Sequence, residues 1–499
     1  MSDDAATPRV SRPDLIAAAV LAVMAAVLYV RTLCPTVYWY DSAEFSAHAV
    51  GLGVPHPPGY PLYTLVAHVF TWLPVEPALA VNIMSLTFGV ASVVLAYAIV
   101  RQLGGSLMAA AIGAATLMVI RTMWANAVVA EVYTPGLVMT FGALSLLLRA
   151  HVQDWRRGST LAGLVGGLGV GMHMSITTFG LGYAWLVWTR GLPERLSPKM
   201  LVSQLRSRLV ASGYSLLAAV GGLLIFAYVP LRKFQRWDAR EWTVFRKNST
   251  GGAFKRKFLQ DYDLQERWEF VGDIFVDNLQ VAGLVLAVGG LGWLLWRRPK
   301  MGIGVVLAAA GNLWWFFNYN VPDLDVFFLP CLAVLCVGVG LSADALATPL
   351  QRLRPALGHV GWALLLLPAF LVQRNYEEVD LSDDREAAAY GEAVCDAVPN
   401  DARVVLYSSP TEWRYYSVFI YMQATAERCA GAGIWKKPNL DSVDRALRRG
   451  DTVFTFRALR RLKTRFRVVP VGPLWRLLPK AKMGGRAKPV RSRRTRPKP

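Results

Sequence analysis

The sequence predicts a mainly α-helical, polytopic membrane protein of about eleven transmembrane helices, with a small α/β domain near its C-terminus. Of its 499 residues, 54% are hydrophobic and 18% are charged, whereas about a quarter of the residues of an average soluble domain are charged. Apolar runs recur between residues 14 and 373. Many of them approach the length of about 20 residues that crosses a hydrocarbon core.

The first apolar run, residues 15–30, has no charged side chain and is followed by Arg31 and by Cys34-Pro35. A cleaved signal peptide would end in a small-x-small site, so this run is predicted to be a retained anchor. Hydrophobic periodicity and length predict eleven spans in all. They lie near residues 14–33, 78–100, 107–125, 133–150, 159–174, 176–190, 209–230, 279–297, 302–319, 326–347 and 358–373.

The distribution of Lys and Arg in the short loops predicts a cytoplasmic N-terminus, residues 1–13. Basic residues precede the first span and follow the fourth, sixth, eighth and tenth. The opposite face then receives the first external loop, residues 34–77, and everything after residue 374. It also receives an external loop at residues 231–278, which opposes the rule because it carries ten Lys or Arg.

The part after the last span changes character. In residues 374–479, "ARVVLYSS" and "DTVFTF" are typical of buried strands and "TEWRYYSVFIYMQATAERC" of a half-buried helix, which predicts a small α/β domain. Cys395 and Cys429 could pair if this domain is exported. Residues 480–499 contain nine Lys or Arg and no acid, which is typical of a disordered tail that associates with membranes or polymers. Nothing else in the chain favours nucleic acid as a partner.

Polar side chains that are rare in such an apolar chain gather on the predicted outer face. Carboxylates at membrane depth are costly and tend to be functional. The alternatives are structural ion pairs and, for the first two acids, a capping box in which Asp41 caps a helix and Glu44 completes it. The candidates are Asp41, Glu44, His56 and Tyr60 in the first loop, Glu131, Tyr133 and His173 in later turns, and Arg232, Asp323 and Asp325 at span ends.

The stretch "YDSAEFSAHAVGLGVPHPPGYPLY" resembles the signature of a bacterial membrane protein family, G-D-S-G-E-F…L-G-x-x-H-P-P-G-Y-P-L-Y. The family is related to an animal transmembrane protein O-mannosyltransferase. Further segments follow in the family's order: "VNIMSL", "AEVYTP", "GVGMHMS", "YVPLR" and "NYNVPDLDVFFLP". The resemblance covers roughly residues 14–372. Tyr40 and Ala43 depart from the usual small residues, and nothing is carried over to the C-terminal part.

The resemblance implies a glycosyltransferase of the GT-C type, which takes a sugar from a polyprenyl-phosphate carrier on the non-cytoplasmic side of the membrane. It places a carboxylate of the first external loop near the anomeric carbon, which suits Asp41, with Glu44 as the second candidate. The chemistry needs a base for the acceptor hydroxyl and positive charge on the departing phosphate. Arg232 is predicted to bind that phosphate, and His56 or His173 to donate to it or to position the acceptor.

Several functional choices stay open at this stage. A divalent metal is compatible with Asp41, Glu44 and His56 as ligands, but no D-x-D motif requires one. The family suggests mannose and a protein hydroxyl, while a glycan acceptor is the alternative. The expected setting is a bacterial inner membrane, with membrane lipids as partners and the site facing the periplasm or exterior. A multi-span transporter is the rival class, although the ionisable residues lie at span ends and no repeat is visible. A non-catalytic scaffold is the third class.

Overall fold

The computed structural model describes residues 11–152, 156–191, 205–235, 238–249, 252, 257–259, 263–321, 323–406, 410–426 and 429–480. The predicted basic tail and most of the predicted cytoplasmic N-terminus therefore lie outside the described residues. The chain divides into two compact units, residues 1–388 and 389–499. The boundary lies further along the chain than residue 374, because the last long helix continues to Val379.

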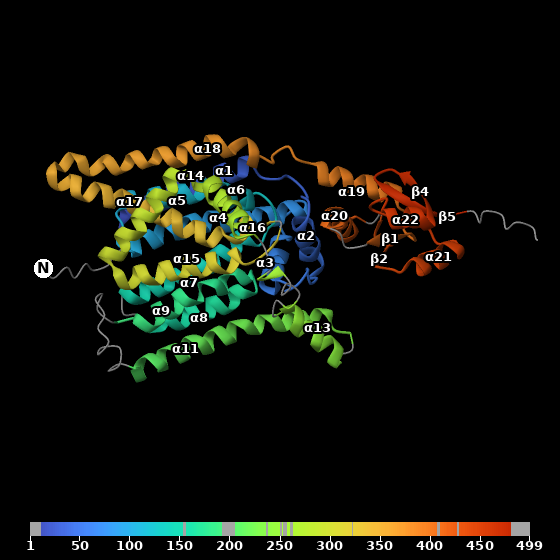
Figure 1. The fold of residues 1–499 in the computed structure, drawn as a ribbon, viewed down its shortest axis with the longest axis horizontal. Helices are drawn as coiled ribbons and strands as arrows, with labels where there is room; N and C mark the ends of the chain where they lie inside the picture. Colours follow the sequence, from blue (N-terminus) through green and yellow to red (C-terminus); the bar gives the residue numbers. More distant parts are fainter. Residues whose placement is uncertain are drawn as a thin grey trace, which may run out of the picture. The chain divides into compact units, whose positions relative to one another are not determined.

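The first unit is a bundle of long helices, with the short helices α2, α3 and α16 gathered at one end (Figure 1). Its first helices are α1 (Arg12–Arg31), α2 (Asp41–Gly51), α3 (Pro61–Phe70), α4 (Pro77–Gln102), α5 (Leu107–Val119), α6 (Arg121–Ala127), α7 (Tyr133–Val152), α8 (Arg156–Val170), the 3-10 helix η1 (Met174–Phe179) and α9 (Gly180–Thr189). The remaining helices are α11 (Leu205–Leu223), η2 (Leu224–Ala227), α12 (Tyr228–Lys233), α13 (Ala239–Ser249), α14 (Leu264–Arg297), α15 (Pro299–Phe317), α16 (Leu324–Phe327), α17 (Leu329–Leu353), η4 (Pro355–Leu365) and α18 (Leu366–Val379).

Within the described residues, seven helices are long and apolar enough to cross a membrane, or eight if the bent pair α5 and α6 forms one span. The predicted spans near 133–150, 159–174 and 176–190 are also helical, as α7, α8 and η1–α9. Helix therefore occupies each of the eleven predicted positions. The polytopic, mainly helical fold class with a small C-terminal sheet is confirmed.

Small residues allow the helices to approach one another closely, as is common in membranes, where association depends on packing. A Cβ atom at Gly290 of α14 would lie 1.9 Å from the carbonyl oxygen of Gly338 in α17. A Cβ atom at Gly167 of α8 would lie 2.0 Å from the carbonyl oxygen of Ala219 in α11. The bundle core is therefore set by backbone contact between these helix pairs.

The described parts of the segment 231–278 are largely helical, whereas the sequence predicts a loop. It contains α12, the amphipathic α13 and the first turns of α14, which begins after Asp263 caps the backbone N–H groups of Gln265 and Glu266. Gln280, with φ 57°, breaks the regular helix at the point where the predicted span starts. The polar first part and the apolar second part of α14 are thus separated by a kink.

The second unit is a small α/β domain, as the sequence predicts. Its sheet has the order β2-β1-β3-β5-β4, with β1 parallel to β2 and β3, and β5 antiparallel to β3 and β4. A disulfide joins Cys395 and Cys429. The elements are α19 (Glu386–Ala397), β1 (Arg403–Leu406), α20 (Pro410–Thr425), β2 (Gly433–Lys436), α21 (Leu440–Arg448), β3 (Val453–Thr455), α22 (Arg460–Arg465), β4 (Phe466–Val471) and β5 (Leu474–Pro479).

Candidate active site

The loop between α2 and α3 is built to hold one conformation. Gly59 has φ 102°, and a Cβ atom there would lie 3.1 Å from the Val229 side chain, so glycine suits the position on both counts. The hydroxyl of Tyr228 donates to the carbonyl oxygens of Leu52 and Gly53, at 2.6 and 2.9 Å. The loop that carries His56 is therefore fixed against α12.

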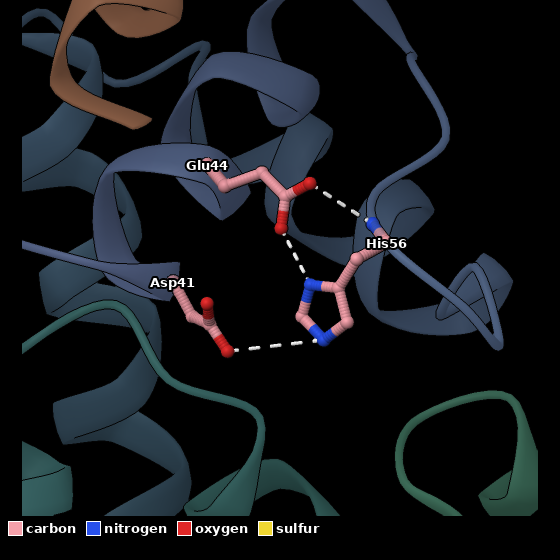
Figure 2. Close-up of side chains that lie close together, drawn as sticks. All are labelled: Asp41, Glu44 and His56. Atoms are coloured by element: carbon pink, nitrogen blue, oxygen red, sulfur yellow. Dashed lines mark hydrogen bonds and ion pairs between the residues drawn. The ribbon is translucent and has the colours of Figure 1, made fainter. Parts of the chain in front are cut away.

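Glu44 and His56 form the closest polar contact of the site (Figure 2). The Glu44 carboxylate, 5% exposed, accepts from His56 Nδ1 at 2.5 Å and from the His56 backbone N–H at 3.0 Å. The Asp41 carboxylate lies 3.8 Å from His56 Nε2 on the other side of the ring. The helix begins after Tyr40 with no side-chain cap. The capping-box alternative is therefore wrong, and the Glu44 carboxylate binds His56 instead.

This contact sets the charge of the imidazole. Burial lowers the pKa of His56, but the charge of Glu44 and its hydrogen bond act in the opposite direction. The charges of Asp41 and Glu131 add to this, and the pKa of His56 rises to about 9. The ring is therefore a cation at neutral pH, held between two carboxylates.

Two further carboxyl groups from distant parts of the chain face the same space. Burial and the charges of Asp41 and Asp323 raise the pKa of Glu131 well above its usual value. Desolvation and the charges of Asp41 and Asp325 likewise raise the pKa of Asp323, which keeps an exposed surface, against the opposing charge of Lys257. Asp41, Glu131 and Asp323 therefore act on one another, although 90 residues separate the first two.

Aromatic rings line this group of charges. Tyr60 lies beside His56, with 3.2 Å between its hydroxyl and Nε2, and stacks on His173 with ring centroids 6.2 Å apart. The His173 ring also contacts Tyr133 and Phe327, at 5.0 and 5.5 Å between centroids. His173 is buried and its Nδ1 lies 2.7 Å from the Ser175 hydroxyl. The structure thus brings together eight of the ten residues singled out from the sequence.

The other two, Arg232 and Asp325, make structural contacts instead. The Arg232 guanidinium donates to the carbonyl oxygens of Gly51 and Leu52, at 2.9 and 2.8 Å. These carbonyls close α2 at the end opposite Asp41, about 15 Å away at 1.5 Å per helical residue. Asp325 pairs with Arg121 at 3.4 Å, although its charge also acts on Asp323. The phosphate role predicted for Arg232 stays a prediction, and the structure gives this side chain a second role in holding α2.

Three residues of the site carried no assigned role in the sequence analysis. Ser85 binds the loop of Glu131, accepting from its N–H at 3.1 Å and donating to its carbonyl at 3.3 Å. Asn82, one helical turn earlier, donates to the carbonyls of Cys34 and Thr36. Both belong to "VNIMSL", and their spacing of three puts them on one face of α4. Lys257 is placed by backbone pairing of its segment, where Asn320 N–H donates to the Lys257 carbonyl.

The donor atoms of Asp41, Glu44 and His56 fit a divalent cation. One ligand atom from each lies within 4.8 Å of the others, and carboxylate oxygen with imidazole nitrogen is a donor set that zinc and related metals accept. Binding would require His56 to lose its proton, because only the neutral imidazole coordinates a metal. The proton and a metal are therefore alternative occupants of the same space.

A separate cavity of about 550 Å³ lies between the His56 loop and α12–α13. Its walls include Pro55, Pro57 and Val229 and the acids Asp238 and Glu241, but neither His56 nor the carboxylates of the cluster, Asp41, Glu44, Glu131 and Asp323. This cavity is therefore distinct from the charged cluster, and the proline loop separates the two.

Comparison with known proteins shows which sequences this chain resembles. Residues 41–195 match the family model described as the Protein O-mannosyl-transferase TMEM260 N-terminal domain, and the match begins at Asp41. The mouse (Mus musculus) Protein O-mannosyl-transferase TMEM260 is 24% identical over 417 residues, which cover 78% of this chain. The chain is therefore similar in sequence to the TMEM260 O-mannosyl-transferase over most of its length. It spans 58% of the length of the mouse protein.

Solved structures with the same fold extend the TMEM260 relationship beyond sequence. ArnT from Cupriavidus metallidurans bound to undecaprenyl phosphate gives a TM-score of 0.58 at 12% identity, covering 95% of this chain and 99% of ArnT. The apo state of ArnT gives 0.60 at 13% identity, with 93% and 96% covered. The Archaeoglobus fulgidus oligosaccharyltransferase gives 0.54 at 11% identity, with 85% and 65% covered. The TMEM260-related chain is a multi-pass membrane protein with the GT-C fold, and the predicted resemblance is confirmed.

Proposed function

We propose that this chain is an integral-membrane glycosyltransferase that transfers a sugar from a polyprenyl-phosphate carrier to an acceptor hydroxyl outside the cytoplasm. The fold and the family relationship support the class of reaction. The observation that carries the proposal is the Asp41–His56–Glu44 arrangement at the outlet of the first span. It offers a carboxylate base, Asp41, at 3.8 Å from the Nε2 atom of His56, which is a cation held in place by Glu44.

Asp41 is the residue proposed as base. Its side chain is 32% exposed, against 5% for Glu44, so a substrate hydroxyl can reach it. In a displacement with inversion, the acceptor oxygen forms a bond to the anomeric carbon while the bond from that carbon to the phosphate oxygen breaks. The hydroxyl proton passes to the Asp41 carboxylate, and the bonding electrons leave with the carrier phosphate.

His56 is proposed to stabilise the phosphate as it leaves. A fixed cation beside the developing charge lowers the barrier because it does not have to reorganise during the reaction. Glu44 is a positioning residue in this scheme, since it touches His56 and is too buried to reach substrate. Glu131 and Asp323 have raised pKa values. Their carboxyl groups can hydrogen-bond to sugar hydroxyls.

The proposed side of the membrane follows from chain connections. The end of α1 and the end of α18 meet, because Leu381 N–H donates to the Thr32 carbonyl at 3.1 Å. The chain after α18 leads into the unit that holds the Cys395–Cys429 disulfide. Disulfides persist outside the reducing cytoplasm. The site after α1 is therefore proposed to face the periplasm or exterior of an inner membrane.

The mouse relative is named an O-mannosyl-transferase, and one ArnT structure holds undecaprenyl phosphate. We therefore propose mannose as the sugar, a polyprenyl phosphate as its carrier, and a protein hydroxyl as the acceptor. A glycan hydroxyl is chemically equivalent at the reacting atom, so the acceptor is identified by experiment rather than by the site.

The deciding experiment measures transfer from radiolabelled polyprenyl-phosphate mannose in membranes that contain the protein. Asp41→Asn removes the base while keeping side-chain size, and should lower transfer by about a hundredfold or more. Asp277→Asn is the matched control, because Asp277 pairs with Arg374 away from the cluster. Equal transfer by the Asp41 variant and the wild type would remove Asp41 from the chemistry. No transfer by wild type with any polyprenyl-phosphate sugar would remove the proposed function.

A further inference from the structure

The chain becomes strongly basic after Asp451. Residues 452–499 contain 16 Lys or Arg and no Asp or Glu. Eight of these cations lie in residues 452–480, within the folded α/β unit, so the charge is not confined to the tail. Acid-free basic runs of this kind are typical of segments that bind anionic surfaces.

The fold concentrates several of these cations at one edge of the sheet. β4 is the last strand of the order β2-β1-β3-β5-β4, so one side of it has no partner strand. In the β4–β5 pairing, Arg467 lies opposite Leu478 and Arg476 opposite Val469. The two arginines are therefore diagonal neighbours on the same face of the sheet, at positions on the two strands about 7 to 8 Å apart. Both side chains are exposed.

The opposite face of this edge is also basic. Helix α22 packs on β4 and carries Arg460 and Lys463, both exposed. The Lys463 ammonium lies 5.9 Å from the centre of the Trp475 ring on β5. Lys480 follows β5 directly and donates to the Thr464 carbonyl at 2.9 Å. We call Arg460, Lys463, Arg467, Arg476 and Lys480 the cationic edge.

The acids of this part of the unit pair with cations outside this set. Asp441 pairs with Arg465, Asp444 with Arg448 at 2.9 Å, and Asp451 with Arg403 at 3.3 Å. Among the described residues, the cationic edge makes no ion pair with any of them. Its field is therefore not cancelled locally, and it extends about 8 to 10 Å into solvent at physiological salt.

We propose that the cationic edge docks on anionic phospholipid headgroups of the membrane that carries this protein. The unit begins at residue 389, ten residues after the membrane helix α18 ends at Val379. Such tethering keeps the local concentration of headgroups high, so weak contacts suffice. An exposed edge of separate cations can contact several lipid phosphates at once, and each basic residue near an anionic surface strengthens binding by about fivefold.

The proposal is tested with the full-length protein in nanodiscs that contain a photo-crosslinkable phosphatidylglycerol or its phosphatidylcholine equivalent. We expect crosslinks in the peptide 457–480 to be at least about tenfold more abundant with phosphatidylglycerol. High salt should reduce them, because exposed charges are screened. Arg467→Glu combined with Arg476→Glu should lower them by at least about tenfold. The other edge of the sheet supplies the control, Lys436→Glu combined with Lys437→Glu, which changes net charge equally and should leave them unchanged.

Three results would overturn the proposal. Equal crosslinking to the neutral and the anionic lipid is the first, and equal loss in the two charge-reversed variants is the second. The third is displacement of the phosphatidylglycerol crosslinks by an anionic polymer, such as double-stranded DNA or an acidic polysaccharide, which would make the polymer the partner. Persistence of the Cys395–Cys429 disulfide in both variants verifies that the unit remains folded.

Discussion

Glu44 should control the protonation of His56, and the substitution Glu44→Gln isolates that effect. The amide keeps the shape of the side chain but removes its charge. One of its two polar atoms becomes an N–H group facing His56, whose backbone N–H and Nδ1 both contact the carboxylate in the native chain. The amide N–H can donate to Nδ1 only when the imidazole is neutral. The variant therefore favours the neutral imidazole in two ways. It removes the negative charge beside the ring, and it supplies an N–H group that only the neutral ring can accept.

The magnitude follows from the pKa. The pKa of His56 is raised from 6.5 to about 9, which corresponds to about 3 kcal/mol in favour of the cation. At pH 8 a group of pKa 9 is about 90% protonated and one of pKa 6.5 about 3%. Asp41 and Glu131 retain part of the effect, so we expect the cation, and with it the transfer rate, to fall about tenfold at pH 8. At pH 6 both enzymes hold the proton, and their rates should agree within about threefold.

The assay is the pH–rate profile of sugar transfer from a polyprenyl-phosphate donor. The alkaline limb should lie near pH 9 in the wild type and move towards neutrality in Glu44→Gln. Glu76→Gln is the control, because Glu76 accepts from Thr36 outside the cluster. The pair also affects stability: its contribution is full below pH 6.5 and is lost as pH rises through 9, since the folded pKa is the higher one. An alkaline limb at the same pH in both enzymes would refute a catalytic role for the His56 cation.

Three further predictions concern the scaffold. Arg232→Ala should lower the stability of the solubilised protein by about 1 kcal/mol, measured by thermal unfolding, because α2 loses two donors; a raised KM for the donor with unchanged unfolding would instead support phosphate binding. Gly290→Ala should destabilise the bundle strongly, because its Cβ would meet the Gly338 carbonyl, whereas Gly292→Ala has nothing within 4 Å and should be neutral; equal melting temperatures would contradict the packing. Cys395→Ser should lower the free energy of unfolding of the C-terminal unit by about 4 kcal/mol, because it opens a bridge between residues 34 apart. The loss should be seen as early proteolysis of that unit, and resistance to proteolysis equal to that of the wild type would contradict it.

The sequence predicts the helical bundle well because membrane spans are long and uniformly apolar. It also predicts much of the acidic cluster. Carboxylates at membrane depth are costly, so those at the span ends on one face are expected to lie together in a polar site. It could not predict the partner of Glu44. That contact joins residues 12 apart and depends on the exact path of the 52–60 loop, which closes through a left-handed Gly59 and the anchoring hydroxyl of Tyr228.

Residues that meet across the bundle were the hardest to assign. Arg232 and Arg121 are long cations whose nearest acceptors, the Leu52 carbonyl and the Glu378 carboxylate, come from remote segments. Lys257 reaches the site only because its segment pairs with residues 318–320. The helical start of α14 had a local signal, since Asp263 with Glu266 three residues later resembles a helix N-terminus. The ten Lys or Arg of residues 231–278 favoured the interpretation as a loop, so this helix start was not predicted.

The crowding of carboxyl groups has a thermodynamic consequence for substrate capture. Asp41, Glu44, Glu131 and Asp323 outnumber the cations His56 and Lys257, and an incoming phosphate diester adds another negative charge to the same space. Its arrival raises the proton affinity of Glu131 and Asp323 further, so the carrier and solvent protons enter together. Calorimetric titration in buffers with different heats of ionisation would register that uptake, and the donor would be held more tightly in acidic surroundings than in alkaline ones.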